Sequence, residues 1–233
     1  MKLSVFLAAT LVAFASMASA APLLCTAVGG TMADYVALGS TGCVIGDKLF
    51  SNFLYSSSGA GTGVAVPASA VLLAPVGVTT SNPGIVFSSE WDVPGSSPTR
   101  TSILDSSFGF TVTVLPGGDL IDDASLTLDA FSRTGTGIAT IGESVFAADG
   151  FTQLGFMGVS ANGQLLADVT FAPTRTIQVK KDFALVVPRG TTGSIAVSAF
   201  TENFSEIPEP VGAILIGSGL LALGAWRRRG SRG

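Results

Sequence analysis

The segment Phe108-Gly109-Phe110-Thr111-Val112-Thr113-Val114 alternates large apolar side chains with small or polar ones. Successive side chains of an extended strand point to opposite faces, so this period of two predicts a β-strand with one buried face. The same alternation recurs at 165–171 and at 194–199. Long amphipathic helical patterns are scarce between residues 21 and 206, so sheets are expected to build the body of this protein.

Further strands are expected at 48–56, 85–92, 124–131, 138–146 and 175–187. Glycine, proline and asparagine clusters separate them, as turns require. Asn162-Gly163 suits a type I′ turn and predicts a hairpin joining 156–160 to 164–171. The expected fold is therefore all-β, an antiparallel β-sandwich of the jelly-roll kind, with one short helix near 32–38.

The N-terminus has the three parts of a secretory signal peptide. Lys2 supplies the positive charge, residues 3–15 are almost wholly apolar, and Ala18-Ser19-Ala20 offers small side chains for cleavage. Cleavage is expected between Ala20 and Ala21, since cutting one residue later would place Pro22 just after the scissile bond. The expected organisation is a signal peptide at 1–20 and one β-sandwich domain at 21–206.

The C-terminal segment 207–233 also has three parts. Pro208, Glu209 and Pro210 precede an uncharged stretch at 211–226, and an arginine cluster follows it. The uncharged stretch predicts one transmembrane helix, whose 16 residues rise about 24 Å against a hydrocarbon core of about 30 Å. Basic flanks stay on the cytoplasmic side, which would orient the helix. An ordinary C-terminal membrane anchor is the alternative interpretation. The arginines are Arg227, Arg228 and Arg229.

This tail resembles the PEP-CTERM sorting signal of Gram-negative bacteria. The resemblance implies that exosortase, a membrane protease-transpeptidase, cuts near the Pro-Glu-Pro triplet after signal peptidase has removed the leader. It implies a precursor held transiently in the inner membrane with its C-terminus in the cytoplasm, and a product at the cell surface or outside the cell. Proteins of this family are associated with exopolysaccharide and biofilm material. The segment 38–53 also resembles the opening segment of many such proteins.

Charge and cysteine content limit the partners. Five of the 12 basic residues lie before Ala21 or after Pro210, so the mature body of about residues 21–210 carries 7 basic and 16 acidic residues, a net charge of −9. This balance argues against nucleic acid or anionic lipid as a partner. The pair Lys180-Lys181 is expected at a solvated strand end.

In an exported protein, Cys25 and Cys43 predict one disulfide, because no histidine or third cysteine could complete a metal site.

Nothing in the sequence demands catalysis. The absence of histidine removes Ser-His-Asp and Cys-His arrangements. Paired carboxylates could hydrolyse glycosides, but the spacing of the four candidates equally suits solvated strand faces. No enzyme activity and no cofactor are expected. The four candidates are Glu90, Asp92, Glu143 and Asp149.

Two features of the sequence could bind a ligand, but each also has a simpler explanation. Asp119, Asp122 and Asp123 could offer oxygen ligands to Ca²⁺, but acidic turns are usually just solvated, and no metal site is predicted. Trp91, between two acidic residues, could stack on a sugar, although core packing would also explain it.

The sequence thus predicts an exported, non-enzymatic surface or matrix protein, and the resemblance of its tail implies that this protein acts within extracellular polysaccharide. The alternative is a secreted carbohydrate-binding module with its sugar site near Trp91. A glycan-active enzyme using two carboxylates is the third hypothesis.

Overall fold

The computed structural model describes residues 23–207. The predicted signal peptide with its cleavage site at Ala20 and Ala21, the Pro208–Pro210 motif and the arginine cluster lie outside these residues. The fold prediction is corrected on one point, because it included a transmembrane helix. No helix among the described residues is long and apolar enough to cross a membrane. The expected span at 211–226 lies outside them.

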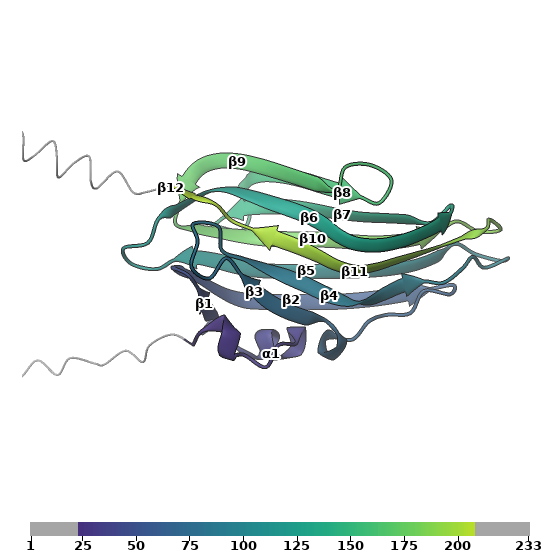
Figure 1. Ribbon diagram of the computed structural model, residues 1–233, viewed down its shortest axis with the longest axis horizontal. Helices are drawn as coiled ribbons and strands as arrows, with labels where there is room; N and C mark the ends of the chain where they lie inside the picture. The colour runs from purple at the N-terminus through teal and green to yellow at the C-terminus, as the bar shows by residue number, and fades with distance from the viewer. Residues whose placement is uncertain (1–22, 208–233) are drawn as a thin grey trace, which may run out of the picture.

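Two antiparallel sheets face each other and form a sandwich (Figure 1). In sheet A the strand order is β1-β2-β5-β10-β7-β8, and in sheet B it is β12-β6-β11-β4-β3, with β9 also paired to β6. The strands are β1 Cys43–Ile45, β2 Lys48–Ala60, β3 Leu72–Val76, β4 Gly84–Val93, β5 Ser102–Val114, β6 Leu120–Gly135, β7 Ile138–Ala147, β8 Gln153–Ser160, β9 Leu166–Thr174, β10 Thr176–Val187, β11 Gly193–Asn203 and β12 Glu206–Ile207.

The eight strands β4 to β11 divide into two groups of four neighbouring strands. Sheet B contains β4-β11-β6-β9, and sheet A contains β5-β10-β7-β8. This is the strand order of a jelly roll. Strands β1 and β2 extend sheet A beside β5, and β3 extends sheet B beside β4. The predicted antiparallel β-sandwich is therefore confirmed.

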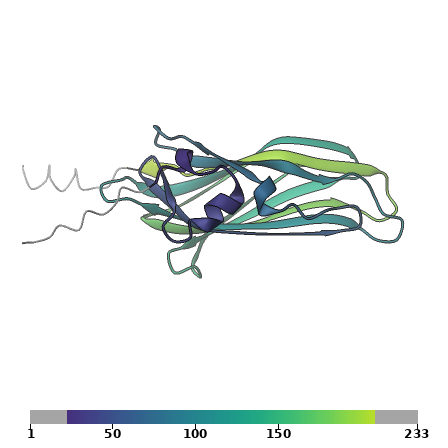
Figure 2. The same ribbon diagram turned by 90° about the horizontal axis from the view of Figure 1, so that it is seen from below.

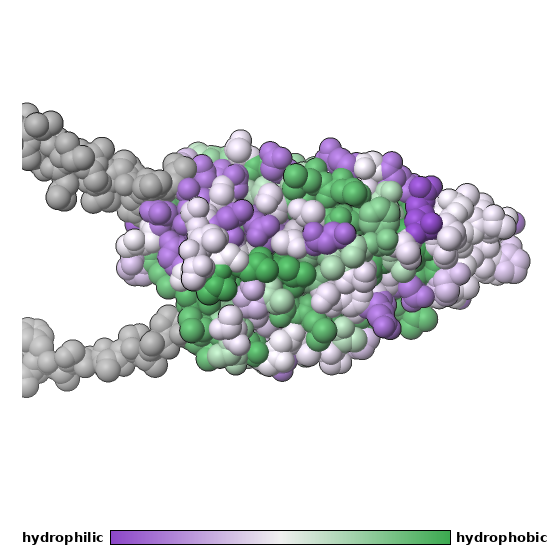
Figure 3. Space-filling view, viewed as in Figure 1, coloured by the Kyte–Doolittle hydropathy of each residue, from purple (hydrophilic) through white to green (hydrophobic). Residues whose placement is uncertain are grey.

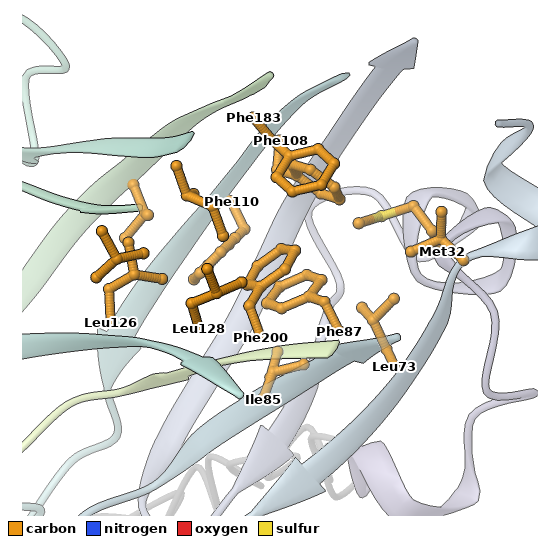
Figure 4. Packing of buried hydrophobic residues seen from close by; sticks show 14 of the residues in the cluster. Met32, Leu73, Ile85, Phe87, Phe108, Phe110, Leu126, Leu128, Phe183 and Phe200 are labelled. Carbon is orange, nitrogen blue, oxygen red and sulfur yellow. The ribbon is translucent and has the colours of Figure 1, made fainter. Parts of the chain in front are cut away.

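The core lies between the sheets and is rich in phenylalanine (Figure 4). The period-two prediction for β5 is confirmed, because Phe108, Phe110, Val112 and Val114 are all buried. Phe87 of β4 and Phe200 of β11 stack with their ring centroids 4.9 Å apart. Such offset aromatic pairs each stabilise by about 1 kcal/mol beyond the area that they bury.

A short helical segment closes one side of the sandwich (Figure 2). Helix α1 (Met32–Ala37) lies close to the expected 32–38 and begins with a capping box between Thr31 and Asp34. The hydrogen bonds of this box hold the pKa of Asp34 below its usual value. The predicted disulfide between Cys25 and Cys43 is confirmed, and it ties the chain before α1 to β1.

A fully buried lysine joins the beginning of the sandwich to its last strand. The Lys48 ammonium at the start of β2 lies 2.8 Å from the Glu206 carboxylate in β12 and 2.6 Å from that of Asp47. It also donates to the backbone carbonyl of Asp119 at 2.8 Å. Three acceptors satisfy its three protons, so the burial of this charge is compensated.

Two local predictions differ from the structure, and one strand lies outside the expected set. The turn at Asn162-Gly163 exists, but β8 belongs to sheet A and β9 to sheet B, so the expected hairpin is wrong. In β11 a bulge at Ser198 breaks the alternation, so Val197 and then Phe200 are buried. Strand β3 was not anticipated; Pro75 is tolerated there because β3 is an edge strand of its sheet.

Candidate functional site

Among the hollows of the described residues, two lie on opposite outer faces of the sandwich. The first, on sheet A, is here called the aromatic face, with a volume of about 310 Å³. The second, on sheet B beneath the 61–71 loop, is here called the loop groove, with a volume of about 630 Å³. The aromatic face is lined by Gly142, Ser144, Phe146, Phe156, Lys180, Lys181 and Asp182. The loop groove is lined by Val64, Ala65, Val66, Pro67, Ala70, Leu72, Ser88, Ser89, Glu90, Asp92 and Ser198.

Strand register aligns the side chains of the aromatic face. Phe156 of β8 lies opposite Ser144 of β7, which in turn lies opposite Lys180 of β10. The next positions along this row are Gly109 of β5 and Leu54 of β2. Neighbouring strands lie about 4.8 Å apart, so the row crosses roughly 19 Å of sheet surface.

The Phe156 ring lies over glycines and stays open to solvent. A Cβ atom added to Gly142 would lie 3.6 Å from this ring, and one added to Gly158 would lie 4.0 Å from it. The ring remains 64% exposed. A single added Cβ atom would therefore only touch the ring, and the lack of side chains at these two positions lets the ring lie along the sheet surface.

Charged groups flank the aromatic rings. The Lys180 ammonium lies 4.7 Å from the centroid of the Phe146 ring and has no carboxylate partner within residues 23–207. Asp182 lies on the same face of β10, two residues further on. Burial and the charge of Asp182 raise the pKa of Asp105 on the neighbouring strand above its usual value. This face therefore combines exposed aromatic surface with donors and acceptors for hydrogen bonds, the combination typical of small-molecule sites.

Trp91 does not form part of either hollow, which corrects the prediction of a sugar-stacking residue there. Its side chain is fully buried, with ring centroids 5.1 Å from Phe183 and 5.7 Å from Phe200. The alternation of β4 turns Trp91 inward and its acidic neighbours Glu90 and Asp92 outward. The two acidic neighbours therefore mark the solvent-facing side of β4, and Trp91 lies on the other side, in the core.

The four carboxylates weighed for glycoside hydrolysis do not converge. Glu90 and Asp92 line the loop groove, whereas Glu143 is fully buried between the sheets. Asp149 lies in the β7–β8 turn, where it accepts hydrogen bonds from the backbone nitrogens of Phe151 and Thr152. The Glu143 carboxylate therefore does not lie close enough to another of these carboxylates to form a hydrolytic pair.

In the acidic turn that could have offered ligands to Ca²⁺, Asp119 and Asp123 form hydrogen bonds with other segments of the chain. The Asp119 backbone nitrogen donates to Asp47 at 2.8 Å, and the Asp123 carboxylate accepts from the Ser205 nitrogen at 3.0 Å. Among residues 23–207, no three side chains of the types His, Cys, Asp and Glu gather closely enough to hold a metal ion.

Lys180 and Lys181 are separated by the sheet, which corrects their placement at a solvated strand end. Lys180 lies on the aromatic face, whereas Lys181 points into the core. There the Lys181 ammonium pairs with Glu143 of β7 and Glu202 of β11. Two identical residues in sequence thus occupy opposite faces of one strand, as the period of two requires.

Sequence reasoning missed Phe146, Phe156 and Lys180 as candidates. The sequence pattern places Phe146 and Phe156 in strands, but a phenylalanine in a strand is more often buried than exposed. The available signal was Gly155 and Gly158 around Phe156, because glycine inside a strand often marks a place where a ligand approaches closely.

No model of a known protein family matches the sequence, and no curated protein matches it. Several solved structures are similar. TmCBM61, solved with beta-1,4-galactotriose, is 12% identical, with 63% of this chain and 86% of that chain covered and a TM-score of 0.28. The mannan-recognising carbohydrate-binding module TmCBM27 is 7% identical, with 66% and 97% covered and a TM-score of 0.28.

A third similar structure is the enzymatically active domain of tailspike protein 4 of bacteriophage CBA120. It is 13% identical, with 65% of this chain and 19% of that chain covered and a TM-score of 0.30. All three superpose on this chain only in part, and two of them are carbohydrate-binding modules. The function of this chain is therefore argued from its own side chains.

Proposed function

We propose that the described domain is a non-catalytic carbohydrate-binding module that holds its glycan on the aromatic face. The observation that carries this proposal is the Phe156 ring, which is 64% exposed and lies over Gly142 and Gly158. A large apolar ring kept in water is costly unless a partner covers it. The apolar face of a pyranose ring has the size and shape to do so.

The polar groups around Phe156 suit the edge of the same sugar. Lys180 can donate to ring hydroxyls, and Asp182 can accept from them. If a sugar covers about 80 Å² of the Phe156 ring, apolar burial contributes about 2 kcal/mol at 25 cal/mol/Å². That contribution corresponds to roughly 30-fold in the dissociation constant.

Substitution of Phe156 tests this proposal. The full-length protein is screened on an array of bacterial polysaccharides, and the dissociation constant of the best ligand is measured by calorimetry. Phe156→Ala is expected to weaken binding roughly 30-fold. The matched control is Phe151→Ala, because Phe151 is 89% exposed but lies in the β7–β8 turn outside the aromatic face.

Binding that is lost equally in both variants, or retained in Phe156→Ala, overturns the assignment of the site. Failure of every polysaccharide to bind overturns the proposed function itself. The ligand is also recovered after long incubation and its reducing ends are counted. An increase in reducing ends would contradict a non-catalytic module.

We further propose that this module is exported and acts at the cell surface or in the extracellular matrix. The supporting features are the leader before Ala21 and the Pro208-Glu209-Pro210 triplet, through which signal peptidase and exosortase would process the chain. The mass of the mature C-terminus is compared in cells with and without exosortase. Identical masses that retain Arg227 would refute this processing.

A further inference from the structure

The loop groove combines an apolar wall with an acidic floor. The wall comes from the loop before β3, where Val64 is 71% exposed, and from Leu72 in β3, which is 53% exposed. The floor comes from β4 and β11 and contains Glu90, Asp92 and Ser198. The face shown in Figure 3 likewise intersperses apolar patches with hydrophilic ones.

Hydrogen bonds fix the wall in place. The Tyr55 hydroxyl donates to the Val66 carbonyl at 2.9 Å, and the Val66 nitrogen donates to the Ser57 hydroxyl at 3.1 Å. At the other end of the wall, the Ser89 hydroxyl donates to the Ala70 carbonyl at 2.9 Å. The groove is therefore preformed, so a ligand would not have to order the loop on binding.

The strand geometry places two negative charges together on the floor. Glu90 and Asp92 are two residues apart in β4 and both side chains are exposed on its outer face, so their Cβ atoms lie about 7 Å apart. Ser88, two residues before Glu90, also lines the groove, and the pairing of β4 with β11 shifts register at this point. Within the described chain neither carboxylate accepts a hydrogen bond or pairs with a basic side chain, and no lysine or arginine lines the groove.

We propose that the loop groove binds a linear polyamine, an alkyl chain with two or more ammonium groups. The methylene chain would lie against Val64 and Leu72, and successive ammonium groups would pair with Glu90 and Asp92. The volume of about 630 Å³ is that of a small-molecule site, and it leaves room for such a chain. A groove of this size lacks the broad area that a stable protein partner requires.

The chemistry of the groove favours this ligand over other cations. A bare metal ion would leave the aliphatic wall in water, and two exposed carboxylates offer it few ligands. Alkylammonium ions match both parts of the surface at once. This site lies on sheet B, opposite the aromatic face on sheet A, so the inference does not rest on the proposed glycan site.

Calorimetry of the full-length protein with spermidine at low ionic strength tests the inference. Saturable binding to one site is expected. The double variant Glu90→Gln/Asp92→Asn should raise the dissociation constant about tenfold, since each partly exposed ion pair contributes modestly. The matched control is Asp129→Asn, which removes an exposed charge on β6 of the same sheet, outside the groove, and should leave the dissociation constant within about twofold.

Two further probes distinguish the contribution of the apolar wall from that of the acidic floor. Mg²⁺ carries charge without methylene groups, and hexanol carries an alkyl chain without charge; neither should displace spermidine. Leu72→Ser should weaken spermidine binding about threefold through lost apolar contact. Equal weakening by Asp129→Asn, or displacement by Mg²⁺, would show attraction to the overall negative charge and overturn the inference. Unchanged binding in the double variant would overturn it as well.

Discussion

Replacing Lys181 with methionine should be among the most destabilising single changes in this domain. The Lys181 ammonium is fully buried between the sheets and pairs with the carboxylates of Glu143 and Glu202, which are also fully buried. Each glutamate already leaves one carboxylate oxygen without a hydrogen-bond partner in the described structure. Removal of the one cation would leave both carboxyl groups uncompensated in a low-dielectric environment.

The magnitude follows from the cost of breaking a buried ion pair, which is about 3–5 kcal/mol. Total stabilities of domains are about 5–15 kcal/mol, so the variant would lose a large fraction of its stability. In a domain of this size, 1 kcal/mol corresponds to about 2–4 °C in Tm, so the expected fall is roughly 6–20 °C. Replacing the whole triad, as Lys181→Met/Glu143→Leu/Glu202→Leu, should restore or exceed wild-type stability because no buried charge remains.

The triad also predicts a pH dependence. Burial raises the pKa of Glu202 well above its ordinary value, and the charge of Glu143 adds to this shift. At a pH between the unfolded and the folded pKa of Glu202, this carboxyl group therefore stays protonated in the native state and is ionised in the unfolded chain. This contribution to stability is fully present below the ordinary glutamate pKa of about 4.3 and is lost as the pH rises through the raised folded pKa. Glu202→Gln, which imitates the protonated carboxyl, should flatten this part of the profile.

Urea unfolding of wild type, Lys181→Met, the triple variant and Glu202→Gln across the pH range measures these effects. The free energy of unfolding of Lys181→Met should fall further behind wild type as the pH rises, because two carboxyl groups must then stay neutral or be buried charged. The reasoning is refuted if Lys181→Met costs less than about 1 kcal/mol, or if the triple variant is less stable than the single one.

Two other predictions concern the disulfide and the tryptophan. The double substitution Cys25→Ser/Cys43→Ser opens a loop of 18 residues and should lower the free energy of unfolding by about 3 kcal/mol in urea, and an unchanged midpoint would contradict this. Trp91→Ala should cost about 3–5 kcal/mol by leaving a cavity, yet the folded fraction should bind glycan with the wild-type dissociation constant. Weaker glycan binding by that folded fraction would show that Trp91 contributes to the glycan site.

Much of the fold could be predicted from local patterns. A strand with one buried face must alternate, so the residues of 108–114 indicated both the strand and its inward side. The disulfide followed from cysteine count and an expected oxidising destination. The helix near 32–38 lies almost where it was expected. Each of these features depends on neighbours in sequence or on composition alone.

The candidate sites could not be predicted, because they depend on which strands become neighbours. Phe156 and Lys180 belong to strands on either side of β7, and only the sheet order brings them to one face. The alternation of side chains along a strand places Lys180 and Lys181 on opposite faces of β10. Which of the two is buried depends on Glu202, which the opposite sheet supplies. A local pattern specifies the two faces of a strand. The tertiary structure decides which face is covered, because burial depends on contacts between segments far apart in sequence.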